Sequence, residues 1–355
     1  MKRASRLAVL VSFSLAVFAA NAPKVLPRPN GKSADISKPV QVFILMGQSN
    51  MLGMGRVYGN RPGTLEYAAK VKKKYQYLVD EEGNWTVRKD VRYVRVMGSG
   101  TGPMRVYFNG WLTVKGLRRI GPEFGIGHYL GQAIDAPVLL LKSCIGNRSL
   151  GWDLLPPGSP RVEVEENGKV MVYAGYRDSP AKWEKGTKPK KINWYAGMQY
   201  DGDVRNAKKV LAELPKYYPG AKGYEIAGFF FWQGDKDRYN AVHASLYERN
   251  LVRFIKQLRK DFNAPKAKFV VATLGQTKKG AGGNEGKILN AQLAVDGNSG
   301  KYPEFKGNVA TVYSHPYCHG GASNSHYNGN AETYMDIGEA MGRAMVKLLG
   351  LNAAP

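Results

Sequence analysis

The sequence predicts a single α/β/α domain of three layers, and three observations lead to this prediction. The chain has 355 residues, of which 43% are hydrophobic and 11% aromatic, so it can bury a substantial core and disorder is excluded. Five short apolar runs are mostly continuous rather than alternating, which is typical of strands buried on both faces of a parallel sheet. Helical patterns lie between these runs, and such an alternation of strands and helices favours a parallel sheet covered on both sides.

The predicted elements follow one another without an internal repeat or a low-complexity tract. The predicted strands are residues 40–46, 137–142, 226–232, 269–274 and 309–313. The predicted helices are residues 124–134, 204–214, 242–258, 287–295 and 331–349. The third helix has the clearest apolar stripe, formed by Val242, Leu246, Leu251, Phe254, Ile255 and Leu258.

Residues 1–22 have the three-part layout of a secretory signal peptide. Lys2, Arg3 and Arg6 precede an apolar stretch that is shorter than the roughly 20 residues of a membrane span. We expect cleavage near Ala22, export to the periplasm or the medium, and no stable insertion in a membrane. A retained amino-terminal anchor is the alternative.

The rest of the chain is expected to form a linker and one domain. Residues 23–39 carry four prolines and no apolar period, which indicates a linker to a domain at 40–350. Within the domain, residues 54–120 and 152–199 do not fit the alternation of strands and helices. Each begins just after the carboxyl end of a predicted strand, where open α/β sheets bind ligands, so we expect these two large loop insertions to wall a site. Alternatively, both are surface elaborations.

The first candidate for chemistry is the serine of Gly47-Gln48-Ser49-Asn50-Met51, directly after the first predicted strand. A serine in a tight turn after a strand is exposed at the edge of the sheet, where its hydroxyl can attack a carbonyl if a base takes the proton. The Gly-x-Ser-x-Gly pattern is not matched, because position 51 is Met. A turn serine that caps a helix is the alternative.

Four further blocks follow in order. They are Gly121-Pro122-Glu123-Phe124-Gly125, the run from Lys142 to Leu150 that contains Gly146, Phe231-Trp232-Gln233-Gly234-Asp235, and Ser325-His326-Tyr327-Asn328-Gly329. With these blocks the chain resembles the SGNH-type hydrolases of the sialate O-acetylesterase and carbohydrate esterase class. The resemblance extends over about residues 40–349.

The resemblance implies acyl transfer to water on a flavodoxin-like, parallel five-stranded sheet. Ser49 matches the nucleophile, and His326 matches the general base that deprotonates it. The oxyanion would be met by the backbone amides of Ser49 and Gly146 and by the side-chain amide of Gln233. No metal and no cofactor is needed.

The sequence departs from the family pattern at two positions. Family members often carry an Asp three residues before the catalytic histidine, and here Ser323 stands there. Asp235 is the first candidate for the third catalytic residue and Asp237 the second, although both could be solvated loop acids. Asn147 replaces a second glycine in the oxyanion block, and we expect it to line the site.

Glu123 is the other residue expected in the site wall, unless it only favours the amino end of its helix. The cluster His315, Cys318, His319 and His326 could bind a transition metal. No carboxylate completes the cluster, so we expect no metal there. The two cysteines, Cys144 and Cys318, form either one disulfide or two free thiols.

The charge is strongly basic. Lys+Arg 52 against Asp+Glu 28 gives +24, and removal of the signal peptide leaves +21. Lysine clusters at 72–74 and 182–191 lie in the insertions, where they are either solvated or collect a polyanionic glycan. Binding to nucleic acid is supported by the charge alone. The expected export and the lack of a recognition motif count against it.

These observations predict an exported carbohydrate O-acetylesterase that acts on an acetylated glycan through an acyl-enzyme, and the basic charge favours an acidic glycan. A non-catalytic carbohydrate-binding protein on the same fold is the alternative from a different class. An SGNH lipase or thioesterase is a further alternative, but it would need a long apolar groove, whereas the insertions offer Tyr, Trp and charged side chains. The glycan and the oligomeric state stay open.

Overall fold

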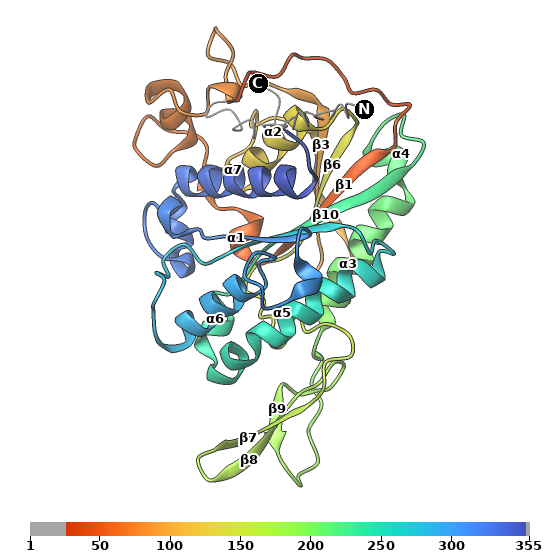
Figure 1. Cartoon of the computed structure of the whole chain (residues 1–355), viewed down its shortest axis with the longest axis vertical. Coiled ribbons are helices and arrows are strands. Elements are labelled where there is room, and N and C mark those ends of the chain that lie inside the picture. Colours follow the sequence, from red (N-terminus) through yellow and green to blue (C-terminus); the bar gives the residue numbers. More distant parts are fainter. Residues whose placement is uncertain (1–25, 353–355) are drawn as a thin grey trace, which may run out of the picture.

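A twisted sheet of seven strands divides the computed structural model, which describes residues 26–352, into two halves (Figure 1). Its order is β12-β11-β10-β1-β6-β3-β4. The strands are β1 (Val40–Gly47), β3 (Arg88–Met97), β4 (Arg105–Leu112), β6 (Val138–Ser143), β10 (Tyr224–Trp232), β11 (Lys268–Ala272) and β12 (Val309–Val312). All neighbours pair in parallel except β3 and β4, which are antiparallel.

All five predicted strands are present, as β1, β6, β10, β11 and β12. They are apolar throughout because the central strands are buried on both faces; every residue of β6 is buried. The prediction of a five-stranded sheet is wrong in number. The first insertion was expected to be a loop, but it contributes β3, which pairs in parallel with β6, and β4 at the edge.

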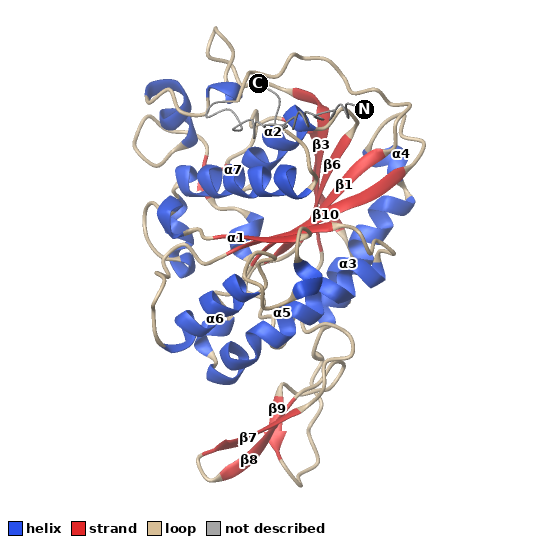
Figure 2. Ribbon diagram, viewed as in Figure 1, coloured by secondary structure: helices blue, strands red, loops and turns tan. Residues whose placement is uncertain are grey.

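Helices cover both faces of the sheet, as predicted (Figure 2). One face packs against α2 (Glu123–Ala133) and α7 (Ala331–Leu348). The other packs against α3 (Met198–Ala212), α5 (Ala241–Asp261) and α6 (Gly283–Ala294), with the short α4 (Leu214–Tyr217) following α3. Side-chain caps fix two of the starts: Asn240 accepts from the amides of the first turn of α5, and Asn330 does the same for α7.

The remainder of the first insertion lies beside α7. It contains β2 (Gly55–Arg56), which pairs with β5 (Arg119–Ile120), a π-helical turn at Tyr67–Val71 and a 3₁₀ turn at Gln76–Leu78. The second insertion forms an arm of three antiparallel strands that projects from the body (Figure 1). These strands are β7 (Val162–Glu166), β8 (Lys169–Tyr173) and β9 (Lys182–Glu184).

The signal peptide predicted at 1–22 lies outside the described residues. The described part of the predicted linker lies against the domain: Leu26 is buried in the core, and Arg28 Nε donates to the carbonyl of Val79 at 2.9 Å. Within residues 26–352, no helix has the length and apolarity needed to cross a membrane.

Candidate active site

The motifs meet at one edge of the sheet, where the parallel strands β1, β6 and β10 end. Ser49 follows β1, Gly146 lies in the loop after β6, and Gln233 follows β10 directly. The chain passes from β1 to β6 on one side and later returns to β10 on the other, so β1 and β10 form a topological switch point. Ligands bind at such points in open α/β sheets.

The turn that carries Ser49 is tightly built. Gly47 has φ +146°, and a Cβ there would lie 2.3 Å from the carbonyl oxygen of Trp232, so only glycine fits. The chain then enters the single helical turn α1 (Ser49–Leu52). Ser49 is 7% exposed, and its hydroxyl makes no hydrogen bond within the described chain. The hydroxyl is therefore available to a substrate and a base.

The loop after β6 passes beside this serine. A Cβ built on Gly146 would lie 3.6 Å from Ser49 Cβ. The N–H groups of Ser49 and Gly146 donate to no acceptor in the part of the chain that the structure describes. Two unpaired N–H groups beside a serine hydroxyl have the arrangement of donors that an oxyanion requires. Asn147, the next residue, is exposed and has φ +56°.

His326 lies in the 3₁₀ segment Ser323–Gly329, which packs against α1. It has φ +51°, and the two following residues also have positive φ, so this segment holds an unusual backbone conformation. The half-exposed imidazole makes no hydrogen bond with Ser49. Catalytic hydrogen bonds of unliganded enzymes often tighten only when substrate binds.

Asp235 approaches the histidine segment through Ser323. The Ser323 hydroxyl donates to Asp235 Oδ1 at 2.5 Å, and Arg238 Nε donates to the same oxygen at 2.8 Å. The Asp235 side chain is 13% exposed, so it is not a solvated loop acid. The serine at the position of the family aspartate is thus bonded to the carboxylate that was predicted to replace it.

Asp237, the second candidate, has a different place. It is fully buried and accepts hydrogen bonds from the amides of Leu150 at 2.8 Å and Gly151 at 2.7 Å and from Gln233 Nε2. Burial raises the pKa of Asp237 to about 6, against the lowering effect of these three donors. Asp237 therefore fastens the loop after β6 to the loop after β10 and does not face His326.

The structure corrects the role predicted for Gln233. Its side chain is fully buried, and Nε2 donates to Asp237 and to the carbonyl of Arg148 at 2.9 Å. Its Oε1 accepts from the hydroxyl of Tyr247 at 2.8 Å. Because both amide hydrogens have protein acceptors, none is left for an oxyanion. Gln233 instead supports the loop that carries Gly146.

Glu123 is also corrected, because it lies beneath the site and not in its wall. It is 2% exposed and pairs with the fully buried Lys142, with Nζ and Oε2 2.5 Å apart. Lys142 Nζ also donates to the carbonyl of Leu52 at 3.2 Å, and Glu123 accepts from the amide of Gly121 at 3.1 Å. A buried ion pair thus holds the end of the turn that carries Ser49.

The two cysteines, His315 and His319 have the following states and partners. Cys144 and Cys318 are free thiols, so the alternative of a disulfide is not realised. His315 Nδ1 lies 2.8 Å from the carbonyl oxygen of Gly275, and His319 Nε2 lies 3.1 Å from Asp336. Within residues 26–352, no group of His, Cys, Asp and Glu has the arrangement of a metal site.

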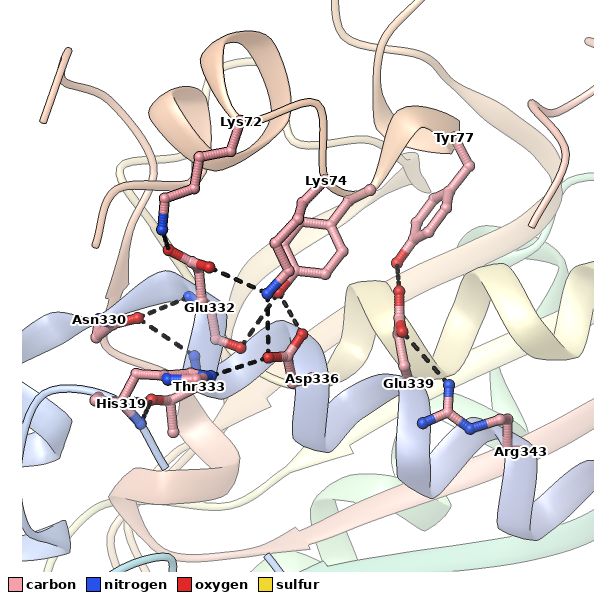
Figure 3. Close-up of polar contacts among 11 residues, drawn as sticks. Lys72, Lys74, Tyr77, His319, Asn330, Glu332, Thr333, Asp336, Glu339 and Arg343 are labelled. Carbon is pink, nitrogen blue, oxygen red and sulfur yellow. Dashed lines mark hydrogen bonds and ion pairs between the residues drawn. The ribbon is translucent and has the colours of Figure 1, made fainter. Parts of the chain in front are cut away.

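The first lysine cluster is bound to α7 and does not stand free at a site mouth (Figure 3). Lys72 pairs with Glu332 at 2.8 Å, and Lys74 pairs with Glu332 at 3.0 Å and with Asp336 at 3.2 Å. Burial alone would lower the pKa of Lys74, but the charges of Asp336 and Glu332 raise it. This cluster therefore docks the first insertion on the helix.

A cavity of about 280 Å³ lies beside the loop that carries Gly146, and no motif in the sequence indicated it. Its lining includes Ile145, one residue before Gly146, together with Met97, Arg105 and Tyr107 from the strands β3 and β4. Arg105 is exposed and has no acidic partner within the described residues. By contrast, Lys142 could have been found in the sequence, as a single charge within an apolar buried strand.

Comparison with known proteins adds a family match. Residues 179–347 match the family model described as carbohydrate esterase, sialic acid-specific acetylesterase. The match includes Asp235 and His326, and Ser49 lies outside it. It confirms the resemblance stated from the motifs and supports an esterase that acts on sugars. No curated protein sequence shows significant similarity to the chain.

Three solved structures are similar at low identity. A protein from Arabidopsis thaliana is 18% identical, with a TM-score of 0.48, and the match covers 87% of this chain and 99% of that one. A carbohydrate acetylesterase from Xanthomonas citri is 12% identical, with a TM-score of 0.47 and coverage of 87% and 56%. NanS is 12% identical, with a TM-score of 0.45 and coverage of 88% and 97%.

Proposed function

We propose that this chain, which resembles the sialate O-acetylesterase-like carbohydrate esterases, removes O-acetyl groups from sugars with Ser49 as its nucleophile. The observation that carries the proposal is the free Ser49 hydroxyl beside the unpaired N–H groups of Ser49 and Gly146, at the switch point of the sheet. The packing of the His326 segment against α1 supplies a base to the same edge.

The reaction has two halves. His326 takes the proton as Ser49 Oγ attacks the acetyl carbonyl, and the oxyanion accepts hydrogen bonds from the amides of Ser49 and Gly146. The intermediate collapses, the sugar oxygen leaves with the proton from His326, and the acetyl group stays on Ser49. Water then attacks this ester with His326 again as base, which releases acetate and restores the hydroxyl.

In this mechanism Asp235 acts as the third member through Ser323. A carboxylate that binds the imidazole directly both orients it and stabilises its charged form. Here the hydrogen bond of Ser323 to Asp235 ties the backbone of the histidine segment to the loop after β10. Asp235 is therefore a positioning residue, whereas Ser49 and His326 touch the reacting atoms.

We propose that the substrate carries an acetyl group on an acidic sugar. The cavity beside Ile145 is lined partly by Arg105 and Tyr107, and a guanidinium binds a carboxylate in two-point geometry. Replacing Arg105 with Ala should raise KM for an acetylated acidic sugar and leave KM for a neutral aryl acetate unchanged. Equal effects on both substrates would exclude an acidic-sugar subsite.

Export remains part of the proposal. The basic start and apolar stretch of residues 1–22 support cleavage near Ala22. Mass spectrometry of the amino terminus of protein recovered from outside the cytoplasm tests it. An intact Met1 would contradict cleavage.

The Ser49→Ala variant tests the esterase against the non-catalytic alternative. Hydrolysis of an aryl acetate should fall by at least about 10³-fold, because the nucleophile is lost, with an unchanged circular dichroism spectrum. An unaffected rate would exclude Ser49 as nucleophile. Glycan binding by wild-type protein without any turnover would establish a binding protein instead. A long-chain acyl ester cleaved faster than the acetate would favour a lipase.

A further inference from the structure

The two lysine clusters are partly neutralised by acids, although Lys188, Lys190 and Lys191 have no ion pair within the described residues. Lys72 and Lys74 are neutralised by acids of α7. In the arm, Lys182 pairs with Glu166 at 2.6 Å and Lys185 with Glu163 at 2.7 Å. A further group of cations lies together in a hollow of the described surface.

The outer face of α5 has this arrangement. Arg249, Arg253, Lys256 and Lys260 follow one another at steps of four, three and four residues, so they lie on one side of the helix. At 1.5 Å per residue this row is about 16 Å long. All four line a hollow of about 720 Å³ that also contains Tyr302. The row is thus a groove and not a flat surface.

The acids beside the groove do not neutralise its arginines. Glu248, which also lines the groove, is bonded to Lys301 at 2.6 Å and to the hydroxyl of Tyr302 at 2.6 Å. Of the four cations, Lys256 pairs with Glu304 at 2.7 Å. Neither Arg249 nor Arg253 has an acidic partner within residues 26–352. Partial burial, and then the charge of Arg253, lower the pKa of Arg249. Two guanidinium groups that repel each other would be relieved by a bound anion.

We propose that the α5 groove, defined by Arg249, Arg253, Lys256 and Lys260, binds an acidic polysaccharide outside the active site. Charge complementarity requires a polyanion, and a row of this length fits a linear chain with repeated carboxylates. Tyr302 is the one aromatic residue in the lining, and its hydroxyl is held by Glu248. The groove thus lacks the stacked aromatic platforms on which single-stranded nucleic acids bind.

The groove would hold the polymer at a distance from the chemistry. The helix α5 begins at Ala241, shortly after the β10 loop that carries Asp235, and Arg249 lies two turns further along it. A chain bound here raises the local concentration of its acetylated units at Ser49. The choice of a glycan rests on the proposed function, whereas the charge of the groove does not.

The test measures binding of polygalacturonate by the full chain in the Ser49→Ala background, so that binding is read without turnover. Arg249→Glu/Arg253→Glu should weaken binding by about tenfold at low salt, and added salt should abolish the difference. Lys182→Glu/Lys185→Glu changes the net charge equally in the arm and should bind as the parent does. Both variants should keep the parent circular dichroism spectrum.

The possible outcomes separate the proposal of the groove from the alternatives. Equal weakening in both variants would show attraction by net charge alone and overturn the groove. An unchanged affinity of the arginine variant would overturn it as well. Tighter binding of single-stranded DNA than of polygalacturonate would overturn the glycan assignment. If Ser49→Ala keeps full esterase activity while the groove binds as expected, the proposed mechanism fails and the groove stands.

Discussion

The hydroxyl of Ser323 donates a hydrogen bond to the carboxylate of Asp235 across 88 residues of sequence. This contact joins the segment of His326 to the loop after β10. A serine and an aspartate together thus stand where the resemblance implies a single aspartate. A serine cannot stabilise an imidazolium charge, but it can transmit the position of a carboxylate to the backbone beside the histidine.

This relationship predicts a rescue. Asp235→Asn should lower kcat by about 10²-fold and Ser323→Ala by about tenfold, both with little change in KM, since the histidine segment loses its support. Adding Ser323→Asp to Asp235→Asn should restore part of kcat by placing a carboxylate on the histidine segment. Steady-state kinetics with an aryl acetate measures this. Glu285→Gln, which removes the other partner of Arg238, is the control and should leave kcat unchanged.

A second prediction concerns the buried pair of Lys142 and Glu123. Replacing either partner alone should cost about 3–5 kcal/mol of unfolding free energy, because the other charge stays buried without a partner. The double variant Glu123→Leu/Lys142→Met should recover much of that stability and still have a lower kcat, since the carbonyl of Leu52 loses its donor.

Denaturant unfolding and kinetics on the same preparations separate these effects. The ion pair of Arg88 and Asp90, 2.6 Å apart, is the control. Its removal should lower the unfolding free energy and leave kcat of the folded protein unchanged. A double variant with wild-type kcat would show that the buried pair has no role in holding Ser49.

A third prediction follows from Asp237. Burial raises the pKa of Asp237 to about 6, above the ordinary value of 3.8, so the folded state binds the proton more tightly than the unfolded state. Its contribution to stability is therefore full below pH 3.8 and is lost as the pH rises through 6. The loss amounts to about 3 kcal/mol.

Asp237→Asn should remove this component. Unfolding free energies of wild type and variant should be measured at several pH values between 4 and 7. Between pH 4 and 6 the wild type should lose stability with rising pH faster than the variant, and above pH 6 the two slopes should be equal. Parallel curves over the whole range would mean that Asp237 does not titrate there.

A fourth prediction concerns the docking of the first insertion on α7. Burial raises the pKa of Glu332, but the hydrogen bonds from Lys72 and Lys74 outweigh it and lower the pKa below 4.5. The stability from this group is therefore present above pH 4.5 and is lost as the pH falls. Glu332→Gln should lower Tm by about 2–4 °C at neutral pH.

Amide hydrogen exchange locates the effect of Glu332→Gln. Exchange should become faster in residues 67–78, which the two lysines hold on the helix, and should not change in β11. Faster exchange throughout the sheet would contradict a local docking role.

The periodic parts of this protein could be predicted from sequence. The apolar run of β6 and the amphipathic stripe of α5 are local patterns, and both elements are present within a few residues of their expected bounds. The strands β3 and β4 could not be assigned in this way. Both strands contain charged residues among the apolar ones, because β4 lies at the edge of the sheet and several residues of β3 are not fully buried. Neither strand therefore forms a continuous apolar run.

The sequence by itself determined which residues reach the site edge, since Ser49, Gly146 and the His326 segment follow buried elements in a fixed order. Tertiary structure alone decided what their neighbours do. Gln233 has no free amide hydrogen, Asp235 bonds to Ser323, and Glu123 is buried against Lys142. The physical reason is that hydrogen bonds and ion pairs depend on distances in space, which no local period of the chain records.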